Sequence, residues 1–264
     1  MNFILNLPSL VVVFICSTLN WLLTALGSTL VYFIKNENKK LNEIALGSSS
    51  GIMIAATFFS LLLPAITLLE NQPKFYLALL PLVFMLGAGF VGVLDHLLPH
   101  EHLITHEKEG LHPTHHTRAN LLMFAMTLHN IPEGLAVGVA FANTLPEARI
   151  AALILSIGIG IQNLPEGLAI SLPMKNTGMS KFKSMMYGQF SAIVEIPSAI
   201  IGYLAASIFN EILPFTLAFA AGAMLFVVVE ELIPESKKND ASILGSFTCI
   251  LGFVIMMALD ILLS

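Results

Sequence analysis

The chain is poor in charge and in cysteine. Only 11% of its 264 residues are charged, while 56% are hydrophobic, which leaves too little polar surface to cover a globule in water. The two cysteines, Cys16 and Cys249, both fall inside apolar segments, so a disulfide framework is not expected. No basic cluster exceeds three residues, which argues against nucleic acid as a partner. These scarcities indicate that the lipid bilayer surrounds the chain.

Long apolar runs take the place of charge. A helix needs about 20 apolar residues to cross a hydrocarbon core of about 30 Å. The alternating segments of about 10 residues that are typical of a membrane barrel are missing from the sequence. We therefore predict an all-α polytopic membrane protein, one domain over residues 1–264. Its eight transmembrane helices are expected at about 9–34, 45–69, 75–98, 119–142, 149–174, 184–209, 212–234 and 241–263.

Basic residues are spread unevenly over the predicted loops. Of the 12 Lys and Arg residues, only Lys74 and Arg149 follow spans 2 and 4, and the others follow spans 1, 3, 5 and 7. Because basic loops stay on the cytoplasmic side, both termini are expected to face outward. The cell (plasma) membrane is the expected location.

Spans 4 and 5 carry a repeated element. It reads H-N-I-P-E-G-L-A from His129 and Q-N-L-P-E-G-L-A from Gln162, on neighbouring helices of opposite direction. Inverted repeats with interrupted helices that meet near mid-membrane are typical of the binding site of a secondary transporter. A weaker echo links Gly51, Met53 and Pro64 of span 2 to Gly222, Met224 and Pro234 of span 7.

Three acidic residues are predicted near the middle of the membrane. Glu133, Glu166 and Glu195 lie close to the centres of spans 4, 5 and 6, and no Lys or Arg lies at that depth. A charge there costs roughly 2.5 to 3.5 kcal/mol, so the carboxylates need a cation or must hold protons. A divalent metal ion does the first and competes with protons for the second.

The spacing around these acids predicts a metal site. Residues four apart share a helix face, so His129 points with Glu133, and Gln162 points with Glu166. Imidazole together with carboxylate suits zinc and its neighbours, whereas calcium or magnesium prefers oxygen alone. A buried His is otherwise most often a hydrogen-bonded core residue, and Met53 is equally well explained by packing. The ligands predicted from spacing are His129, Asn130, Glu133, Gln162, Asn163 and Glu166, with Met53 as a further candidate.

Two prolines accompany the ligands. Pro132 and Pro165 have no N–H, so the carbonyls of Leu128 and Ile161 lose their helical partners. Both helices are therefore expected to kink and open beside the site. Non-helical backbone at this depth is tolerated only where it faces protein or a wet cavity.

Histidine is concentrated in the predicted loop between spans 3 and 4. A His-rich tract can bind metal loosely, and this cytoplasmic loop could receive or sense ions; the alternative is a solvated polar loop. The residues concerned, within 99–118, are His100, His102, His106, His112, His115 and His116.

The two P-E-G helices resemble those of the ZIP (Zrt/Irt-like) metal transporters, most closely the GufA-like branch, and the resemblance covers essentially the whole chain. It implies one metal position at His129, Glu133, Gln162 and Glu166 with Met53 nearby. It implies a second position at Asn130, Asn163 and Glu195 with the shared Glu133 and Glu166, although some relatives carry Asp in place of Asn163. Ser60, Glu231 and Asp260 match positions that line the path in relatives.

The same resemblance implies zinc uptake toward the cytoplasm, a homodimer, and movement of spans 1, 4, 5 and 6 against spans 2, 3, 7 and 8. Zn²⁺ is then the transported substrate, with Cd²⁺, Fe²⁺ and Mn²⁺ as further candidates, and no prosthetic group or enzymatic activity is expected. Two other readings stay open: a membrane-embedded metal-dependent hydrolase and a passive metal channel. No H-E-x-x-H occurs in the sequence, and one His with two amides is a weak set for a resident catalytic metal.

Overall fold

The structure is a computed structural model that describes residues 7–34, 39–97, 100–101, 108–109, 118–143, 145–176, 178–208, 210–237 and 243–263. Nearly all of these residues are helical. In chain order the elements are α2 (Ser9–Thr29), η1 (Leu30–Tyr32), α3 (Lys39–Ala55), η2 (Ala56–Leu62), α4 (Leu63–Leu69), α5 (Lys74–Leu97), β1 (His100–Glu101), β2 (Lys108–Glu109), α6 (Arg118–Ala140), α7 (Pro146–Asn176), α8 (Lys181–Ser191), η4 (Ala192–Val194), α9 (Glu195–Ile208), η5 (Asn210–Ile212), α10 (Leu213–Val227), η6 (Val228–Leu232), α11 (Ile233–Ser236) and α12 (Leu244–Leu263).

The helices are long enough to cross a membrane. By length and composition, seven of the described helical stretches qualify: Ser9–Tyr32, Glu43–Leu69, Lys74–Leu97, Pro146–Leu172, Lys181–Ile208, Leu213–Leu232 and Leu244–Leu262. α6 adds an eighth helix of 23 residues, about 34 Å at 1.5 Å per residue. The predicted all-helical class is confirmed. Among the described residues the sole extended structure is the β1–β2 pair of two residues each.

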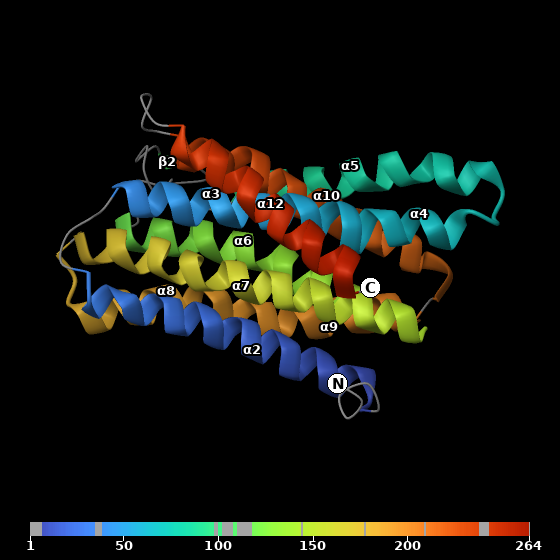
Figure 1. Cartoon of the computed structure of the whole chain (residues 1–264), viewed down its shortest axis with the longest axis horizontal. Coiled ribbons are helices and arrows are strands. Elements are labelled where there is room, and N and C mark those ends of the chain that lie inside the picture. The colour runs from blue at the N-terminus through green and yellow to red at the C-terminus, as the bar shows by residue number, and fades with distance from the viewer. Residues whose placement is uncertain are drawn as a thin grey trace.

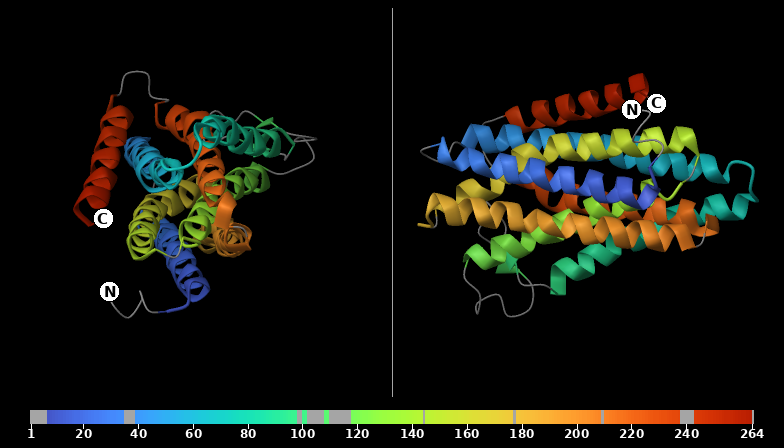
Figure 2. Two further views of the ribbon diagram at one scale, coloured as in Figure 1. Left: turned by 90° about the vertical axis from the view of Figure 1, so that its right-hand side faces the viewer. Right: turned by 90° about the horizontal axis from the view of Figure 1, so that it is seen from below.

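The helices run side by side along the long axis of the molecule (Figure 1). The start of α2 and the end of α12 both lie toward the end of the bundle that carries the α4–α5 turn, which projects beyond them. Viewed end-on, α5 and α12 occupy opposite flanks, and α6 and α7 lie between them (Figure 2). The repeated P-E-G helices therefore occupy the interior of the bundle.

Helix pairing follows a two-fold pattern. α2 packs on α7 as α9 packs on α6, and α12 packs on α3 as α5 packs on α10. If span 1 (α2) is exchanged with span 6 (α9), span 2 (α3) with span 7 (α10), span 3 (α5) with span 8 (α12) and span 4 (α6) with span 5 (α7), each of these pairs becomes another of them. The pattern agrees with the inverted repeat that the sequence predicts.

Close backbone approaches obey the same exchange. Gly51 lies against the carbonyl of Cys249 in α12, and Gly222 lies against the carbonyl of Phe84 in α5. On the partner helices, Gly252 of α12 lies against the carbonyl of Ser48, and Gly87 of α5 lies against the carbonyl of Phe219. A Cβ at any of these four glycines would overlap the neighbouring chain. Small residues at such contacts let membrane helices approach closely.

The helical ladder is interrupted elsewhere than predicted. α6 and α7 remain helical through Pro132 and Pro165, so the expected opening at these prolines is wrong, while the expected kinks stay a prediction. Instead, η2 and η6 are π-helical and end two residues before Pro64 and Pro234 in spans 2 and 7. A wider π turn accepts the N–H five residues on, which accommodates a proline ring that would clash with the carbonyl four residues earlier.

Adding one methyl group to α5 tests the close packing of spans 3 and 7. A Cβ at Gly87 would meet the Phe219 carbonyl, whereas nothing lies within 4 Å of a Cβ at Gly89. We expect Gly87→Ala to destabilise the protein by about 1 to 3 kcal/mol, measured as a lower unfolding temperature in detergent. Gly89→Ala should leave that temperature unchanged or slightly raised. Equal effects of the two substitutions would contradict the packing described.

Candidate metal site

One pair at the centre of the bundle joins α6 to α7. Gln162 Nε2 donates a hydrogen bond of 2.6 Å to Glu133 Oε1. Both side chains are buried, at 0% and 1% exposure. The bond uses the amide nitrogen, so it leaves Gln162 Oε1 and Glu133 Oε2 facing other directions.

A second pair of the same kind joins α7 to α9. Asn163 Nδ2 donates a hydrogen bond of 2.9 Å to Glu195 Oε1 and one of 3.4 Å to the carbonyl of Asn20 in α2. Glu195 is the first residue of α9 and follows the tight 3₁₀ turn η4. The hydrogens of the Asn163 amide are thus committed to protein acceptors, and its oxygen is not. Both pairs are called amide–carboxylate pairs below.

These two pairs leave buried oxygens without a hydrogen-bond partner among the described residues: Glu133 Oε2, Gln162 Oε1, Asn163 Oδ1 and Glu195 Oε2. Each is a carboxylate or amide oxygen and can only accept. An unpaired buried acceptor costs about 1 to 3 kcal/mol, and more if it is charged. Carboxylate and amide oxygens of this kind are ordinary metal ligands, so each of the four is a candidate ligand for a cation.

Glu166 brings a third carboxylate to the same region. Its side chain is buried, and its charge acts on both Glu133 and Glu195. Asn130, which matches Asn163 in the repeat, is fully buried in α6. Glu133, Glu166, Glu195 and the two amides therefore lie in one region inside the bundle; that they hold an ion stays a prediction. Repulsion between neighbouring ionised acids is relieved when a counter-ion binds or when an acid is protonated.

Two predicted ligands are less completely placed. His129 lies in α6 one turn before Glu133, but its side chain is outside the described residues. Met53 is buried in α3, one turn after Ser49, whose Oγ donates a hydrogen bond of 3.3 Å to the carbonyl of Gln162. That bond turns this face of α3 toward the site, and sulfur coordination by Met53 stays a prediction.

Across the described side chains, no three His, Cys, Asp or Glu groups are arranged to hold a metal ion. Glu133, Glu166 and Glu195 therefore form no such cluster by themselves. The proposed set adds amide oxygens to them, and the His129 side chain, which is not described. The arrangement can bind a cation through mixed carboxylate and amide oxygens, with imidazole as the expected nitrogen ligand.

Close helix contacts hold the two pairs in place. Gly134 lies against the backbone of Glu195, and Gly167 lies against the backbone of Thr24. A side chain at either position would push α9 away from α6 or α2 away from α7. These are the glycines of the two P-E-G motifs, which explains why each proline–glutamate step is followed by the smallest residue.

Asn20 is a site neighbour that sequence reasoning missed. It is buried in α2, and its amide, correctly oriented, donates 3.1 and 3.3 Å hydrogen bonds to the carbonyls of Ser156 and Cys16. This ties α2 to α7 where the Asn20 carbonyl accepts from Asn163. A polar residue inside the first apolar run was the available signal.

The predicted path residues lie away from the centre. Ser60 Oγ donates a hydrogen bond of 3.1 Å to Asp260 Oδ1, joining spans 2 and 8. Glu231 is buried in η6. The two-fold exchange relates Ser60, nine residues after Gly51, to Glu231, nine after Gly222.

Asp95 was not predicted as a path residue. It is nearly buried in α5 and lies eight residues after Gly87, as Asp260 lies eight after Gly252. Spans 3 and 8 thus carry acids at equivalent depths, toward opposite ends of the bundle. Comparison of the two halves of the sequence would have found it.

The His-rich loop lies largely outside the described residues. His102, His106, His112, His115 and His116 fall there, and only the backbone of His100, paired with Glu109, is described. Metal contact by this loop stays a prediction.

Comparison with known proteins identifies the family. The sequence profile described as "ZIP Zinc transporter" matches residues 99–260. Zinc transporter ZIP11 of Xenopus tropicalis is 36% identical, over 92% of this chain and 94% of the relative. The chain belongs to the ZIP family. Zinc transporter GufA of Myxococcus xanthus is 37% identical over 91% of this chain and 94% of its own length. Zinc transporter ZupT of Streptococcus mutans is 35% identical over 92% and 94%.

Membership in the ZIP family confirms the predicted resemblance. The sequence similarity extends across both halves of the inverted repeat. The profile covers spans 4 to 8, and the alignments with whole relatives also take in most of spans 1 to 3. Which residues hold the ion is a separate matter, for which the geometry above is the support.

Neutralising one acid without changing its shape tests the buried charge. Glu133→Gln keeps an oxygen that can accept from Gln162 and removes one of three carboxylates. We expect the metal-free variant to unfold in detergent at the same temperature as the wild type or higher. Zinc at 100 times its Kd should stabilise the wild type by about 2.7 kcal/mol, and this gain should vanish in the variant.

The matched control is Glu147→Gln at the exposed start of α7. It should keep the full stabilisation by zinc. A normal zinc response in Glu133→Gln would contradict the assignment of Glu133 to the ion.

Proposed function

We propose that this protein carries divalent transition-metal ions, zinc foremost, toward the cytoplasm through a site between α6 and α7. The observation that carries the proposal is the set of four buried carboxylate and amide oxygens whose hydrogen-bond capacity the protein leaves unused. The names of the relatives, all zinc transporters, agree with it. The proposed ligands are His129, Asn130, Glu133, Gln162, Asn163, Glu166, Glu195 and Met53.

Zinc is favoured over calcium or magnesium because His129 offers a nitrogen and Met53 a soft sulfur beside the oxygens. Cd²⁺, Fe²⁺ and Mn²⁺ are further candidate substrates for the same donors. The metal is cargo, so the proposal includes no prosthetic group.

Binding must also be reversible, and the hydrogen bonds suggest how. Each carboxylate of the two amide–carboxylate pairs keeps one oxygen on an amide and offers the other to the ion. The protein therefore retains a neutral hydrogen-bonded partner for each acid when the ion leaves. Two adjacent positions, sharing Glu133 and Glu166, are part of the proposal; with Asn at 163 the second is the less anionic.

Movement of spans 1, 4, 5 and 6 against spans 2, 3, 7 and 8 is proposed for release. Backbone-to-backbone contacts at glycine occur within each group, as at Gly167 with Thr24 and at Gly51 with Cys249. Between the groups, Gly158 meets only the side chains of Met256 and Ile52. An interface made of side chains slides more readily than one of interlocked backbones.

The setting of this transporter is proposed as follows. It lies in the plasma membrane with both termini outside, because the basic loops lie at the opposite end of the bundle.

It forms a homodimer, for which the flanking helices α5 and α12 offer large exposed apolar faces. Ser60, Glu231 and Asp260 line the path, and the His-rich loop receives the ion. Mass measurement in nanodiscs and accessibility of terminal tags test these points.

Zinc uptake into proteoliposomes tests the function. Wild-type protein should take up zinc, and His129→Ala and Glu133→Ala should each largely abolish uptake while the purified variants remain folded. Glu147→Ala is the control and should transport normally. Uptake unchanged by both site substitutions would defeat the assignment, and competing metals at several pH values would rank the substrates.

The same preparation separates the alternative functions. A membrane-embedded hydrolase should retain stoichiometric metal after dialysis against a chelator, because a catalytic metal is held permanently. A transporter should lose it. A passive channel should show uptake that does not saturate with zinc concentration.

A further inference from the structure

Span 2 holds a buried hydroxyl that hydrogen bonding within the protein does not explain. Thr57 lies in the π-helical stretch η2 and is 4% exposed, and its Oγ1 has no hydrogen-bond partner among the described residues. Helical threonines usually bond a carbonyl three or four residues earlier, as Thr216 does with Leu213 at 2.8 Å and Thr248 does with Leu244 at 3.0 Å. A buried polar group without a partner is costly, so the Thr57 hydroxyl needs another explanation.

The side chain of Thr57 points into the bundle. Thr57 follows Met53 by one helical turn, so the two share the face of span 2 that lies toward the candidate metal site. Two residues on, Phe59 packs its ring against Phe253 of the flanking helix α12, and helical residues two apart point in roughly opposite directions. On its other sides η2 contacts α6, α7 and α10. The hydroxyl therefore faces these interior helices, about 6 Å beyond Met53 along the helix axis toward the α4–α5 turn.

The inverted repeat shows what packing requires at this position. Two buried faces correspond under the two-fold exchange, one in span 2 and one in span 7: Met53, Thr57 and Leu61, and Met224, Val228 and Leu232. Methionine and leucine recur, and the middle residue differs only by a hydroxyl in place of a methyl group. Valine and threonine have nearly the same shape, so packing at this position is satisfied without a hydroxyl. The hydroxyl is thus a polar addition to one half of the repeat.

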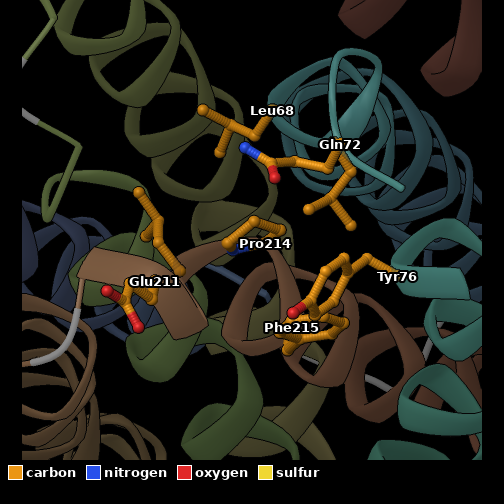
Figure 3. Close-up of a pocket in the computed structure, with 8 residues that line it drawn as sticks. Leu68, Gln72, Tyr76, Glu211, Pro214 and Phe215 are labelled. Carbon is orange, nitrogen blue, oxygen red and sulfur yellow. The ribbon is translucent and has the colours of Figure 1, made fainter. Parts of the chain in front are cut away.

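Two hollows lie further along span 2, and Thr57 lines neither of them. One lies beside the α4–α5 turn, where Leu68, Gln72 and Tyr76 are among its lining residues (Figure 3). The other is lined by apolar side chains that include Leu62 and Ile66. The Thr57 hydroxyl therefore gains no partner from water or lipid in these hollows.

We propose that the Thr57 hydroxyl is a transient binding point for the hydrated metal ion between the Ser60–Asp260 pair and the central site. Ser60 lies three residues beyond Thr57 toward the α4–α5 turn, and Met53 lies four residues before it. A hydroxyl can both donate and accept, so it can hold a water molecule of the ion's shell on a face that is otherwise apolar. A neutral oxygen holds the ion weakly, and conduction requires sites that also let the ion leave. This inference rests on the proposed transport function.

Initial rates of zinc uptake into proteoliposomes, measured over a series of zinc concentrations, test the hydroxyl. Thr57→Val removes it and keeps the shape of the side chain, and Thr57→Ser retains a hydroxyl. We expect Thr57→Val to lower the maximal rate about three- to tenfold, the effect of one hydrogen bond, and Thr57→Ser to stay within about twofold of the wild type. Stabilisation of the folded protein by zinc should be unchanged in both variants, because the central site is intact.

Unfolding in detergent separates this role from a structural one. Without zinc, Thr57→Val should unfold at the wild-type temperature or higher, because it removes an unpaired buried hydroxyl. Thr216→Val, whose hydroxyl is bonded within α10, is the control and should transport normally. A wild-type rate in Thr57→Val, an equal loss in Thr57→Ser, or a lower unfolding temperature of Thr57→Val would overturn the inference and leave transport standing. No uptake by the wild type would defeat the proposed function, and this inference with it.

Discussion

Carboxylates buried in a bilayer without a fixed cation are the constraint on which the rest of this structure depends. Glu133, Glu166 and Glu195 lie inside the bundle, and the basic residues of the described chain lie at or near helix ends. The protein supplies a hydrogen-bond donor to only one oxygen of two of these acids. An amide from α7 donates to Glu133 Oε1, and another donates to Glu195 Oε1. Glu133 Oε2 and Glu195 Oε2 have no hydrogen-bond partner in the described chain.

Neighbouring residues of one helix serve both acids. Gln162 turns to α6 and Asn163 turns to α9, because successive residues of an α-helix point about 100° apart. The orientation of each amide decides which of its atoms is free to bind an ion. Because the amide nitrogen donates to a carboxylate, the amide oxygen points away from that carboxylate. In the proposed metal site, two neutral side chains thereby serve as ion ligands and as supports for the acids at once.

The inverted repeat explains why the site lies where it does. Spans 4 and 5 exchange under the two-fold pattern of helix pairs, so their P-E-G motifs meet where the pattern centres. The close glycine contacts of spans 2 and 7 with spans 8 and 3 build an outer frame in the same way. The equivalent acids Asp95 and Asp260 then lie toward opposite ends of the bundle, which suits a path that runs from one face to the other.

Much of this organisation can be predicted from the sequence, because it depends on periodicity and composition. The spans follow from apolar length, and the shared helix faces of His129 with Glu133 and of Gln162 with Glu166 follow from i, i+4 spacing. The place of Glu195 beside them is what the family resemblance implies. What escaped prediction depends on packing between distant segments. The pairing of Asn163 with Glu195, the role of Asn20 and the uninterrupted course of α6 and α7 through their prolines are set by which helices touch. Proline marks where a ladder bond is lost, but neighbouring turns decide whether the helix opens, and here they open before Pro64 and Pro234 instead.

The central claim is that a metal ion occupies the space between the two amide–carboxylate pairs. Anomalous diffraction at the zinc edge, from crystals of the zinc-loaded protein, tests it most directly. The account predicts an anomalous peak about 2.0 to 2.2 Å from a carboxylate oxygen of Glu133, which disappears in Glu133→Gln crystals. A peak confined to the His-rich loop, or one that persists at the centre without Glu133, would contradict it.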